Sequence, residues 1–266
     1  MGLSCCRYTG SRAPMTAPRP SRRIIVALPA YNEAANIGEL LHGIHRALQT
    51  EGLAHSIVVV DDGSRDGTPD ILRTCAQSLP LAVETHSTNQ GLGGTLRDVL
   101  RMACGRAAPG DLIVTMDSDE SHSPDLIPAM VERIGEGCDV VIASRFRPGA
   151  RIHGLAWHRV WASRLGSLLL RAIFPTPGLR DFTSGFRIYR AEALQLAYLR
   201  YGDALVDQPG FSCMVDVLLK MRRLPLVFGE VPLVLRYDLK RSGSKMQLIR
   251  TSLATLRLMC RRRLGW

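Results

Sequence analysis

The chain has 266 residues, 46% of them apolar, and carries a formal net charge of +10 at pH 7. This length and composition supply a buried core and exclude a disordered chain, and the absence of a fixed sequence period excludes a solenoid. Seven scattered cysteines without a C-x-x-C pair exclude a disulfide scaffold and a zinc-thiolate centre, and they favour reduced thiols in the cytoplasm.

The positive charge is concentrated at the two ends of the chain. Residues 1–23 hold five arginines and no acidic residue, and residues 236–266 hold nine Lys or Arg against one Asp, which leaves the middle with a slight negative balance. We expect residues 1–22 to form a disordered basic tail and residues 241–266 to form a basic amphipathic helix. That helix either contacts a membrane surface or packs on the domain with a charged outer face. Basic ends without interleaved aromatic residues argue against a nucleic-acid partner.

Short β-branched runs alternate with helical patterns from residue 24 onward. Strands are predicted at residues 24–28, 56–60, 81–86, 111–116 and 139–144. Each of the first four is followed by a turn and a stretch of helical apolar spacing. Continuous apolar strands that alternate with helices predict an α/β/α sandwich with a mainly parallel sheet buried on both faces.

The alternation loosens beyond residue 145. The elements predicted there are an amphipathic helix at 156–173, a turn that enters a strand at 181–190, a helix at 212–223 and a strand at 227–237 with Pro232 at an edge. The most apolar stretch lies in the first of these helices and is interrupted by Arg164 and Arg171. We therefore expect no membrane-spanning segment.

Polar clusters follow the first four predicted strands. In chain order they are ALPAYNEAAN, VDDGS, NQGLGG and MDSDESHSP. In a parallel sheet, ligands bind beyond the carboxyl ends of the strands, so the four clusters should converge on one edge. A turn with a capping Asp or Ser explains any one cluster, but it explains the whole set poorly. The set predicts a binding site at that edge.

Two pairs of aspartates carry the chemistry of these clusters. Asp117 and Asp119 follow the fourth strand, and a turn lets both carboxylates approach one hard cation such as Mg²⁺ or Mn²⁺, which also binds substrate phosphates. Asp61 and Asp62 follow the second strand, where a carboxylate can accept hydrogen bonds from a nucleobase or a ribose. The alternative for this second pair is a turn that Asp and Gly stabilise.

Six motifs occur in a fixed order along the chain, namely PAYNEAANI, VVVDDGSRDGT, NQGLGGTLR, MDSDESHSP, ASRF and DFTSGFR. In this order and at these spacings they resemble the family 2 glycosyltransferases with a GT-A fold, and more narrowly the dolichyl- or polyprenyl-phosphate mannose synthases. The resemblance covers about residues 22 to 246. It implies a Rossmann-like GT-A glycosyltransferase domain at residues 23–240.

The resemblance also implies roles for individual residues. The nucleotide-binding positions are Pro29, Tyr31, Glu33, Asp61 and Asp117. Asp117 and Asp119 match the aspartates that bind Mg²⁺ or Mn²⁺, and Asp119 and Arg145 are the expected catalytic residues. The positions near the acceptor phosphate and the donor diphosphate are Arg145, Arg159, Ser163, Ser184, Arg187 and Lys245. Asp216 falls where many relatives carry Glu.

These roles imply transfer of a sugar from a nucleotide donor to a polyprenyl or dolichyl monophosphate, with inversion at the anomeric carbon. The first expectation for the donor is GDP-mannose, and UDP-glucose or a related donor stays open. The acceptor lipid places the enzyme at the cytoplasmic face of a membrane as a peripheral protein, by itself or through a membrane-anchoring partner protein. A phosphate acceptor is already anionic at neutral pH, so it needs cations such as Arg145, Arg159 and Lys245 rather than a strong base.

Two other functions fit the same fold. A hydroxyl acceptor on a glycan, a lipid or a secondary metabolite needs a base within hydrogen-bond reach, and Asp216 or, second, Asp181 would be that catalytic residue. A nucleotide-sugar-binding subunit without turnover needs only the donor side. The presence of both cation-binding aspartates, of Arg145 and of the DFTSGFR segment argues against this last function.

Overall fold

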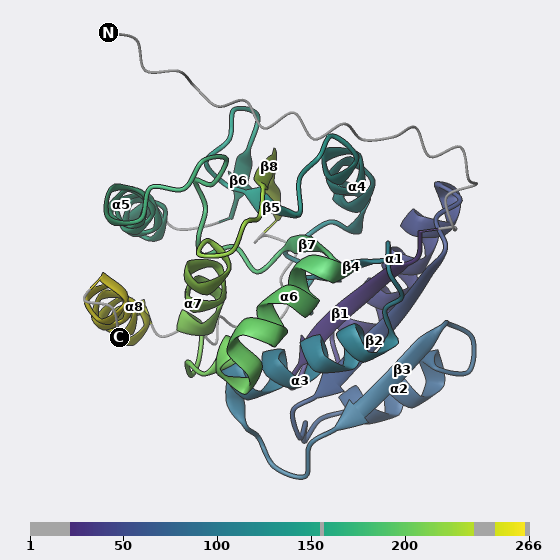
Figure 1. Ribbon diagram of the computed structural model, residues 1–266. Coiled ribbons are helices and arrows are strands. Elements are labelled where there is room, and N and C mark those ends of the chain that lie inside the picture. The colour runs from purple at the N-terminus through teal and green to yellow at the C-terminus, as the bar shows by residue number, and fades with distance from the viewer. Residues whose placement is uncertain (1–21, 155–156, 237–247, 264–266) are drawn as a thin grey trace, which may run out of the picture.

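A seven-stranded sheet forms the middle layer of the computed structural model (Figure 1), which describes residues 22–154, 157–236 and 248–263. In spatial order its strands are β3 Leu81–Thr85, β2 His55–Asp61, β1 Ile24–Ala30, β4 Leu112–Thr115, β7 Arg187–Arg190, β5 Val140–Ser144 and β8 Phe228–Pro232. All neighbouring strands are parallel except β7, which runs antiparallel to both β4 and β5. The predicted α/β/α sandwich with a mainly parallel sheet is confirmed.

Helices cover both faces of this sheet. One face is covered by α1 Ile37–Thr50, α2 Thr68–Cys75 and α4 Ile127–Gly135, with the 3₁₀ helix η1 Pro124–Leu126 before α4. The other face is covered by α3 Gly91–Arg106, α6 Ala191–Tyr201 and α7 Ser212–Met221, with the 3₁₀ helix η2 Gly202–Val206 after α6. Successive residues of β1 point to opposite faces, and all five from Ile24 to Leu28 are fully buried because helices pack on both sides.

Two further helices pack at the side of α7 (Figure 1). These are α5 Trp157–Ile173, which contacts α8 Leu248–Arg263, and α8 itself, which also contacts α7. Leu170 of α5 and Leu258 and Met259 of α8 are buried in the core against α7. Helix α8, which lies within the predicted basic helix at 241–266, therefore packs on the domain. Residues 1–21 of the predicted tail at 1–22, and residues 237–247, lie outside the described part of the chain.

The direction of β7 brings one loop to the carboxyl edge of the sheet. Thr115 of β4 is paired with Arg187 of β7, so the segment that enters β7 arrives where β4 ends. Arg187 is also paired with Ile142 of β5, which ends at the same edge. Residues 145–186 thus form one excursion that contains α5 and the short strand β6 Arg151–His153, and β6 pairs with β9 Val234–Arg236 outside the main sheet.

The predicted elements agree with the observed ones within a few residues, apart from the following differences. The short strand β6 and the 3₁₀ helix η2 have no counterpart among the predicted elements. The predicted strand at 227–237 is divided at Leu233 into β8 and β9, and Pro232 ends β8 at the edge of the main sheet. Helix α6 has no counterpart among the predicted elements, because three of its four buried residues are alanines and give a weak apolar pattern. Among the described residues, no helix has the length and apolar character needed to span a bilayer.

Candidate active site

The loop after β4 carries the two aspartates that are predicted to bind a cation. Asp117 and Asp119 follow the strand end at Thr115, and Asp119 is only 9% exposed. The hydroxyl and the backbone N–H of Ser121 both donate to one oxygen of Asp119, at 2.5 and 3.1 Å. Glu120 has a φ of 58°, in the left-handed region that is unfavourable for residues other than glycine. The chain therefore turns here, as both carboxylates require if they are to reach one ligand.

The DFTSGFR segment that enters β7 lies against this loop. A Cβ on Gly185 would lie 2.9 Å from Oδ1 of Asp117, so only glycine lets the backbone come this close to the carboxylate. The hydroxyl of Thr115 donates to the carbonyl of Gly185 at 2.9 Å and fixes this approach. The hydroxyl of Ser184 is buried and has no hydrogen-bond partner in the described part of the chain. It is therefore available to a ligand bound beside Asp117.

Asp61 and Asp62, at the end of β2, have different roles. Asp62 accepts two backbone N–H groups of residues 90–91 at 2.8 Å and contacts Nδ1 of His86 at 2.7 Å, so it fixes the glycine-rich turn before α3. Asp61 is fully buried, and its Oδ1 accepts the hydroxyl of Ser64 at 2.5 Å. Its Oδ2 is buried without a hydrogen-bond partner among the described residues. The turn interpretation thus holds for Asp62, whereas Asp61 is suited to accept a hydrogen bond from a ligand.

The loop after β1 completes this edge of the site. The carbonyl of Pro29 accepts a hydrogen bond at 2.9 Å from the hydroxyl of Ser118, which lies between the two aspartates that are predicted to bind a cation. Tyr31 is half-buried, and Glu33 is 7% exposed with its backbone N–H donating to Thr68 at 2.9 Å. Because Ala30 pairs with Asp61 across the sheet, the predicted nucleotide-binding residues lie along one edge.

Two residues that the sequence reasoning missed organise this edge. Asn32 has a φ of 50°, a conformation that Asn tolerates better than most residues. Its amide oxygen accepts the N–H of Arg65 and its own N–H donates to the hydroxyl of Ser64, both at 2.8 Å. Ser64 in turn donates to Asp61. The signal for these contacts was present in the Y-N-E and D-G-S stretches, because Asn and Ser side chains commonly stabilise such turns.

Arg145, just after β5, is held by Asp181 of the DFTSGFR segment. Its Nε and Nη2 donate to the two oxygens of Asp181 at 2.8 Å each, and its backbone N–H donates at 3.1 Å. Burial of Asp181 alone raises the pKa of its carboxyl, but the charge and hydrogen bonds of Arg145 outweigh burial and hold the pKa at about 2. The pair is therefore ionised at neutral pH, and it fixes the direction of the Arg145 side chain.

The sequence model of "Glycosyl transferase family 2" matches residues 25–196, a range that contains every position described so far. The chain belongs to glycosyl transferase family 2. This membership confirms the family that the six motifs resemble.

Individual relatives of this glycosyltransferase narrow the comparison. The chain is 30% identical over 229 residues to a polyprenol monophosphomannose synthase of Mycolicibacterium smegmatis, covering 85% of this chain and 82% of that protein. It is 33% identical over 212 residues to an undecaprenyl-phosphate mannosyltransferase of Micrococcus luteus, covering 79% and 82%. Among solved structures, glucosyl-3-phosphoglycerate synthase of Mycobacterium tuberculosis with Mn²⁺, UDP and glucosyl-3-phosphoglycerate has a TM-score of 0.64 at 23% identity, covering 92% of this chain and 80% of that chain. The last likeness confirms the GT-A-like fold.

The glycosyltransferase offers oxygen ligands that fit a divalent cation shared with a substrate. In the described residues, no group of three or more His, Cys, Asp or Glu side chains is placed to hold a metal ion alone. Asp117 and Asp119 are hard oxygen donors, and Mg²⁺ or Mn²⁺ commonly completes its ligand shell with water and substrate phosphate. The pair therefore fits the predicted cation-binding role as part of a site that includes the donor diphosphate.

Arg187 lies inside the glycosyltransferase rather than at its surface. The side chain is 1% exposed, and Nε donates to the carbonyl of Ser184 at 2.7 Å. Nη2 donates to the carbonyls of Phe182 and Met214, at 3.0 and 2.7 Å. These contacts hold the DFTSGFR segment on α7, so the geometry favours a positioning role over the predicted direct contact with a phosphate.

Asp216, the predicted alternative base, is fully buried on α7. Its carboxylate contacts Nζ of Lys220 at 2.5 Å and accepts two hydrogen bonds from Arg262 of α8, at 2.7 and 3.0 Å. Lys220 also contacts Asp207 at 2.9 Å. A carboxylate between two cations is not placed to take a proton from an acceptor, so this geometry speaks against the base role and assigns Asp216 to joining α8 and α7.

The remaining predicted positions are only partly described. Ser163 is half-buried on α5, one helical turn after position 159. Ser167, one turn further, donates to the carbonyl of Arg180 at 2.6 Å, so this face of α5 turns toward the acceptor side of the site. The side chain of Arg159 and the whole of Lys245 lie outside the described residues, and their roles stay predictions.

Proposed function

We propose that this enzyme transfers a sugar, with mannose from GDP-mannose as the first candidate, to the phosphate of a polyprenyl monophosphate. The reaction is a single displacement, which inverts the anomeric carbon and gives a β-linked product from an α-linked donor. The two relatives support this choice, because one is named for polyprenol, the other for undecaprenyl phosphate, and both for mannose. The lipid acceptor places the enzyme at the cytoplasmic face of a membrane as a peripheral protein.

The observation that carries the proposal is that both carboxylates considered as possible bases, Asp216 and Asp181, are already held in buried ion pairs. Asp216 lies between Lys220 and Arg262, and Asp181 is held by Arg145. Breaking either buried ion pair costs about 3–5 kcal/mol, so neither carboxylate is suited to deprotonate a hydroxyl acceptor. A phosphate monoester is ionised at neutral pH and attacks without a base. This favours the lipid phosphate over the hydroxyl acceptor.

On the donor side, each residue has a defined task in the proposal. Oδ2 of Asp61, which has no hydrogen-bond partner among the described residues, accepts a hydrogen bond from the base or the ribose. Tyr31 and Glu33 lie along the same edge. Asp117 and Asp119 hold the diphosphate end of the donor through Mg²⁺ or Mn²⁺, which when bound stabilises negative charge on the leaving diphosphate. The hydroxyl of Ser184 donates to an oxygen of the donor diphosphate beside Asp117.

On the acceptor side, cations replace the base. Arg145, oriented by Asp181, binds the acceptor phosphate and holds one of its oxygens toward the anomeric carbon. Arg159 and Ser163, one turn apart in the sequence of α5, bind the same phosphate in this proposal. Lys245 adds a further cation. The divalent cation that Asp117 and Asp119 would hold, together with the cationic side chains of the acceptor side, would thus bring two anionic substrates into a reactive arrangement.

A transfer assay with matched donors and acceptors tests the proposal. We expect radiolabelled mannose to move from GDP-mannose into a chloroform-soluble product when a polyprenyl phosphate and Mg²⁺ or Mn²⁺ are present, and UDP-glucose to serve less well. The corresponding polyprenol, which has a hydroxyl in place of the phosphate, is the matched control acceptor. Equal transfer to polyprenol or label only in a water-soluble product would contradict the acceptor, and donor binding without any turnover would support a non-catalytic subunit.

A further inference from the structure

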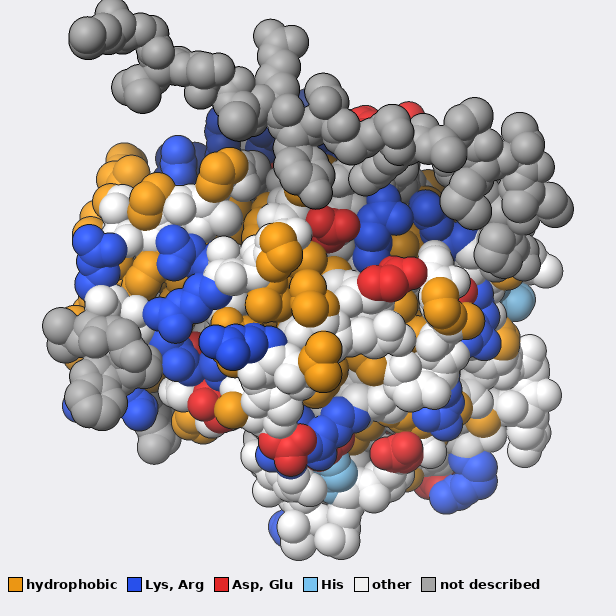
Figure 2. Space-filling view, viewed as in Figure 1, with side chains coloured by type: hydrophobic (Ala, Val, Ile, Leu, Met, Phe, Trp, Pro, Cys, Tyr) orange, Lys and Arg blue, Asp and Glu red, His pale blue; other side chains and the backbone are white. Residues whose placement is uncertain are grey.

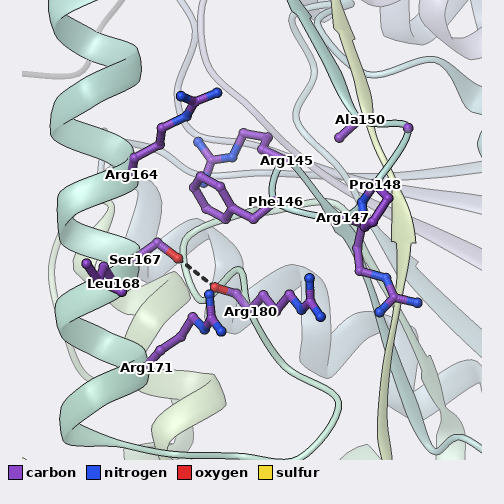
Figure 3. A pocket seen from close by; sticks show the side chains of 11 residues that line it. Arg145, Phe146, Arg147, Pro148, Ala150, Arg164, Ser167, Leu168, Arg171 and Arg180 are labelled. Atoms are coloured by element: carbon purple, nitrogen blue, oxygen red, sulfur yellow. Dashed lines mark hydrogen bonds between the residues drawn. The ribbon is translucent and has the colours of Figure 1, made fainter.

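Two adjoining hollows lie between α5 and the loops on the other side of the acceptor region (Figure 3). They measure about 600 and about 800 Å³. Arg147, Arg171 and Arg180 line both hollows, and Arg164 lines the first. Figure 3 shows Arg164 and Arg171 extending from α5 and Arg180 lying across the floor between the two sides. Because they share these residues, we treat the two hollows as the first and second parts of one arginine-lined hollow, which residues from three separate segments build.

Among the described residues, no carboxylate neutralises the positive charge of this hollow. No Asp or Glu lines either part. In the described chain, the side chains of Arg147, Arg164, Arg171 and Arg180 have no carboxylate within ion-pair distance. By contrast, Arg145 at the mouth of the first part is paired with Asp181. Four uncompensated arginines around one hollow predict an anionic ligand.

The hollow is held in shape by hydrogen bonds on its floor. The hydroxyl of Ser167 donates to the carbonyl of Arg180 at 2.6 Å, which ties the loop to α5. The backbone N–H of Arg180 donates to Oε1 of Glu230 at 2.5 Å, and Nε of Arg222 donates to Thr176 at 3.2 Å. The arginine side chains are therefore mounted on a fixed frame, which lowers the entropic cost of binding.

The outer face of α5 carries an exposed apolar stripe beside these arginines. Trp161, Leu165, Leu168 and Leu169 are 63, 60, 59 and 40% exposed, at the spacing of one helix face. Arg164 and Arg171 flank this stripe. Figure 2 shows basic and apolar side chains interleaved over the part of the surface where Figure 1 places α5 and α8. A soluble anion would leave the stripe in water, whereas a bilayer accounts for both features.

We propose that this hollow binds the phosphate headgroup of an anionic phospholipid while the stripe of α5 enters the boundary between headgroups and acyl chains. Charge and apolar surface then act together, as stable peripheral attachment requires. The first part of the hollow adjoins the proposed acceptor site through Arg145, whereas the second part, which Arg171 and Arg180 also line, contains none of the residues assigned to the donor or the acceptor. The inference rests on the proposed function only in that a lipid acceptor brings the enzyme to a bilayer.

Vesicle flotation without donor or acceptor tests the inference directly. We expect binding to phosphatidylcholine vesicles that contain phosphatidylglycerol, weaker binding to phosphatidylcholine alone, and loss of the difference at high salt. The double variant R171Q/R180Q should bind the anionic vesicles about 25-fold more weakly, since one arginine near an anionic surface contributes about fivefold. The matched control is R46Q/R200Q, which removes two exposed arginines from α1 and α6.

A second pair of variants tests the apolar stripe. L165Q/L169Q should weaken vesicle binding severalfold, and L199Q, which changes a leucine of α6 that is 85% exposed, should not. Equal binding of R171Q/R180Q and the unaltered chain to anionic vesicles would overturn the inference. So would weakening of inorganic phosphate binding without any change in vesicle binding, which would mark a site for soluble anions.

Failure of this inference can be told apart from failure of the proposed function. Transfer to a short-chain polyprenyl phosphate in detergent needs no bilayer, and R171Q/R180Q should keep it unchanged. Loss of vesicle binding in that variant with full transfer in detergent supports the headgroup site. Vesicle binding that depends on these arginines, without any lipid-linked product, would contradict the proposed acceptor and would still support the headgroup site.

Discussion

The donor side and the acceptor side of the site are held together in opposite ways. On the donor side, short loops after β1, β2 and β4 are fixed by neighbouring side chains, as where Ser64 locks Asp61 and Ser121 locks Asp119. On the acceptor side, ion pairs join segments that are far apart in the chain, as where Asp181 holds Arg145. The side chains of the donor side are thus positioned by residues that are close to them in the sequence, whereas those of the acceptor side are positioned by residues far away in the sequence.

The largest effect on the acceptor side is expected from removing the charge of Asp181, the ion-pair partner of Arg145. D181N should lower the free energy of unfolding by about 3–5 kcal/mol, because it leaves a partly buried guanidinium without its charge partner. Urea unfolding measures this change. The matched control is D203N, whose carboxylate is 82% exposed and whose ion pair with Arg101 should contribute under about 1 kcal/mol. Equal stability of the two variants would remove the basis for this prediction.

A substitution on the donor side should lower the transfer activity more than the stability. D119A should reduce transfer by about 10²–10³-fold, because the leaving diphosphate loses electrostatic stabilisation, while circular dichroism and the unfolding midpoint stay close to those of the unaltered chain. D125N changes an exposed carboxylate of η1 that accepts a hydrogen bond from Ser123, and it should keep full transfer. Full transfer by D119A would end its assignment to the cation.

The pH dependence of stability reports on the same acceptor-side pair. The pKa of Asp181 is held at about 2, below its usual value of 3.8, so its ionised form contributes stability above about pH 4. That contribution, about 2 kcal/mol, is lost as the pH falls from 4 toward 2. Urea unfolding of the unaltered chain and of D181N across this range measures it. A stability difference that does not change between pH 5 and pH 2 would contradict the lowered pKa.

A smaller effect is expected where α8 meets α7. R262Q leaves Asp216 with Lys220 as a partner, so the free energy of unfolding should fall by only about 1.5–2 kcal/mol. Hydrogen exchange of α8 should rise with it. R261Q, an exposed neighbour on the same helix, is the control and should leave exchange unchanged. Slow exchange of α8 in R262Q would show that apolar contacts alone hold the helix.

The donor half could be predicted from the sequence because its signals are local. Each strand is a short apolar run. Asp61 is the last residue of β2, and Asp117 and Asp119 follow the end of β4 by two and four residues, so the alternation of strands and helices and the position after a strand were sufficient to find them. The different roles of Asp61 and Asp62 were out of reach, because they depend on which neighbour each carboxylate contacts in the folded loop.

The acceptor half was harder because its decisive contacts are remote. Asp216 matches a functional position by sequence, yet its role depends on Arg262, 46 residues away on another helix. Arg187 belongs to the DFTSGFR motif, but its inward position depends on a hydrogen bond to the carbonyl of Met214 on α7. Arg147, Arg171 and Arg180 come from three segments, and no spacing in the sequence links them.

The pairing of Ile142 with Arg187 brings the two ends of the excursion at residues 145–186 together at the sheet, while β6 and α5 join it to β9 and α8. Everything between, from Arg145 through α5 to the DFTSGFR segment, leaves and returns at adjacent positions on β5 and β7. Because its two ends meet at one place, a change in the length of this stretch need not alter the register of β1, β2 and β4. Under the proposed function, variation within the stretch would change the contacts to the acceptor while the strands of the donor side keep their arrangement.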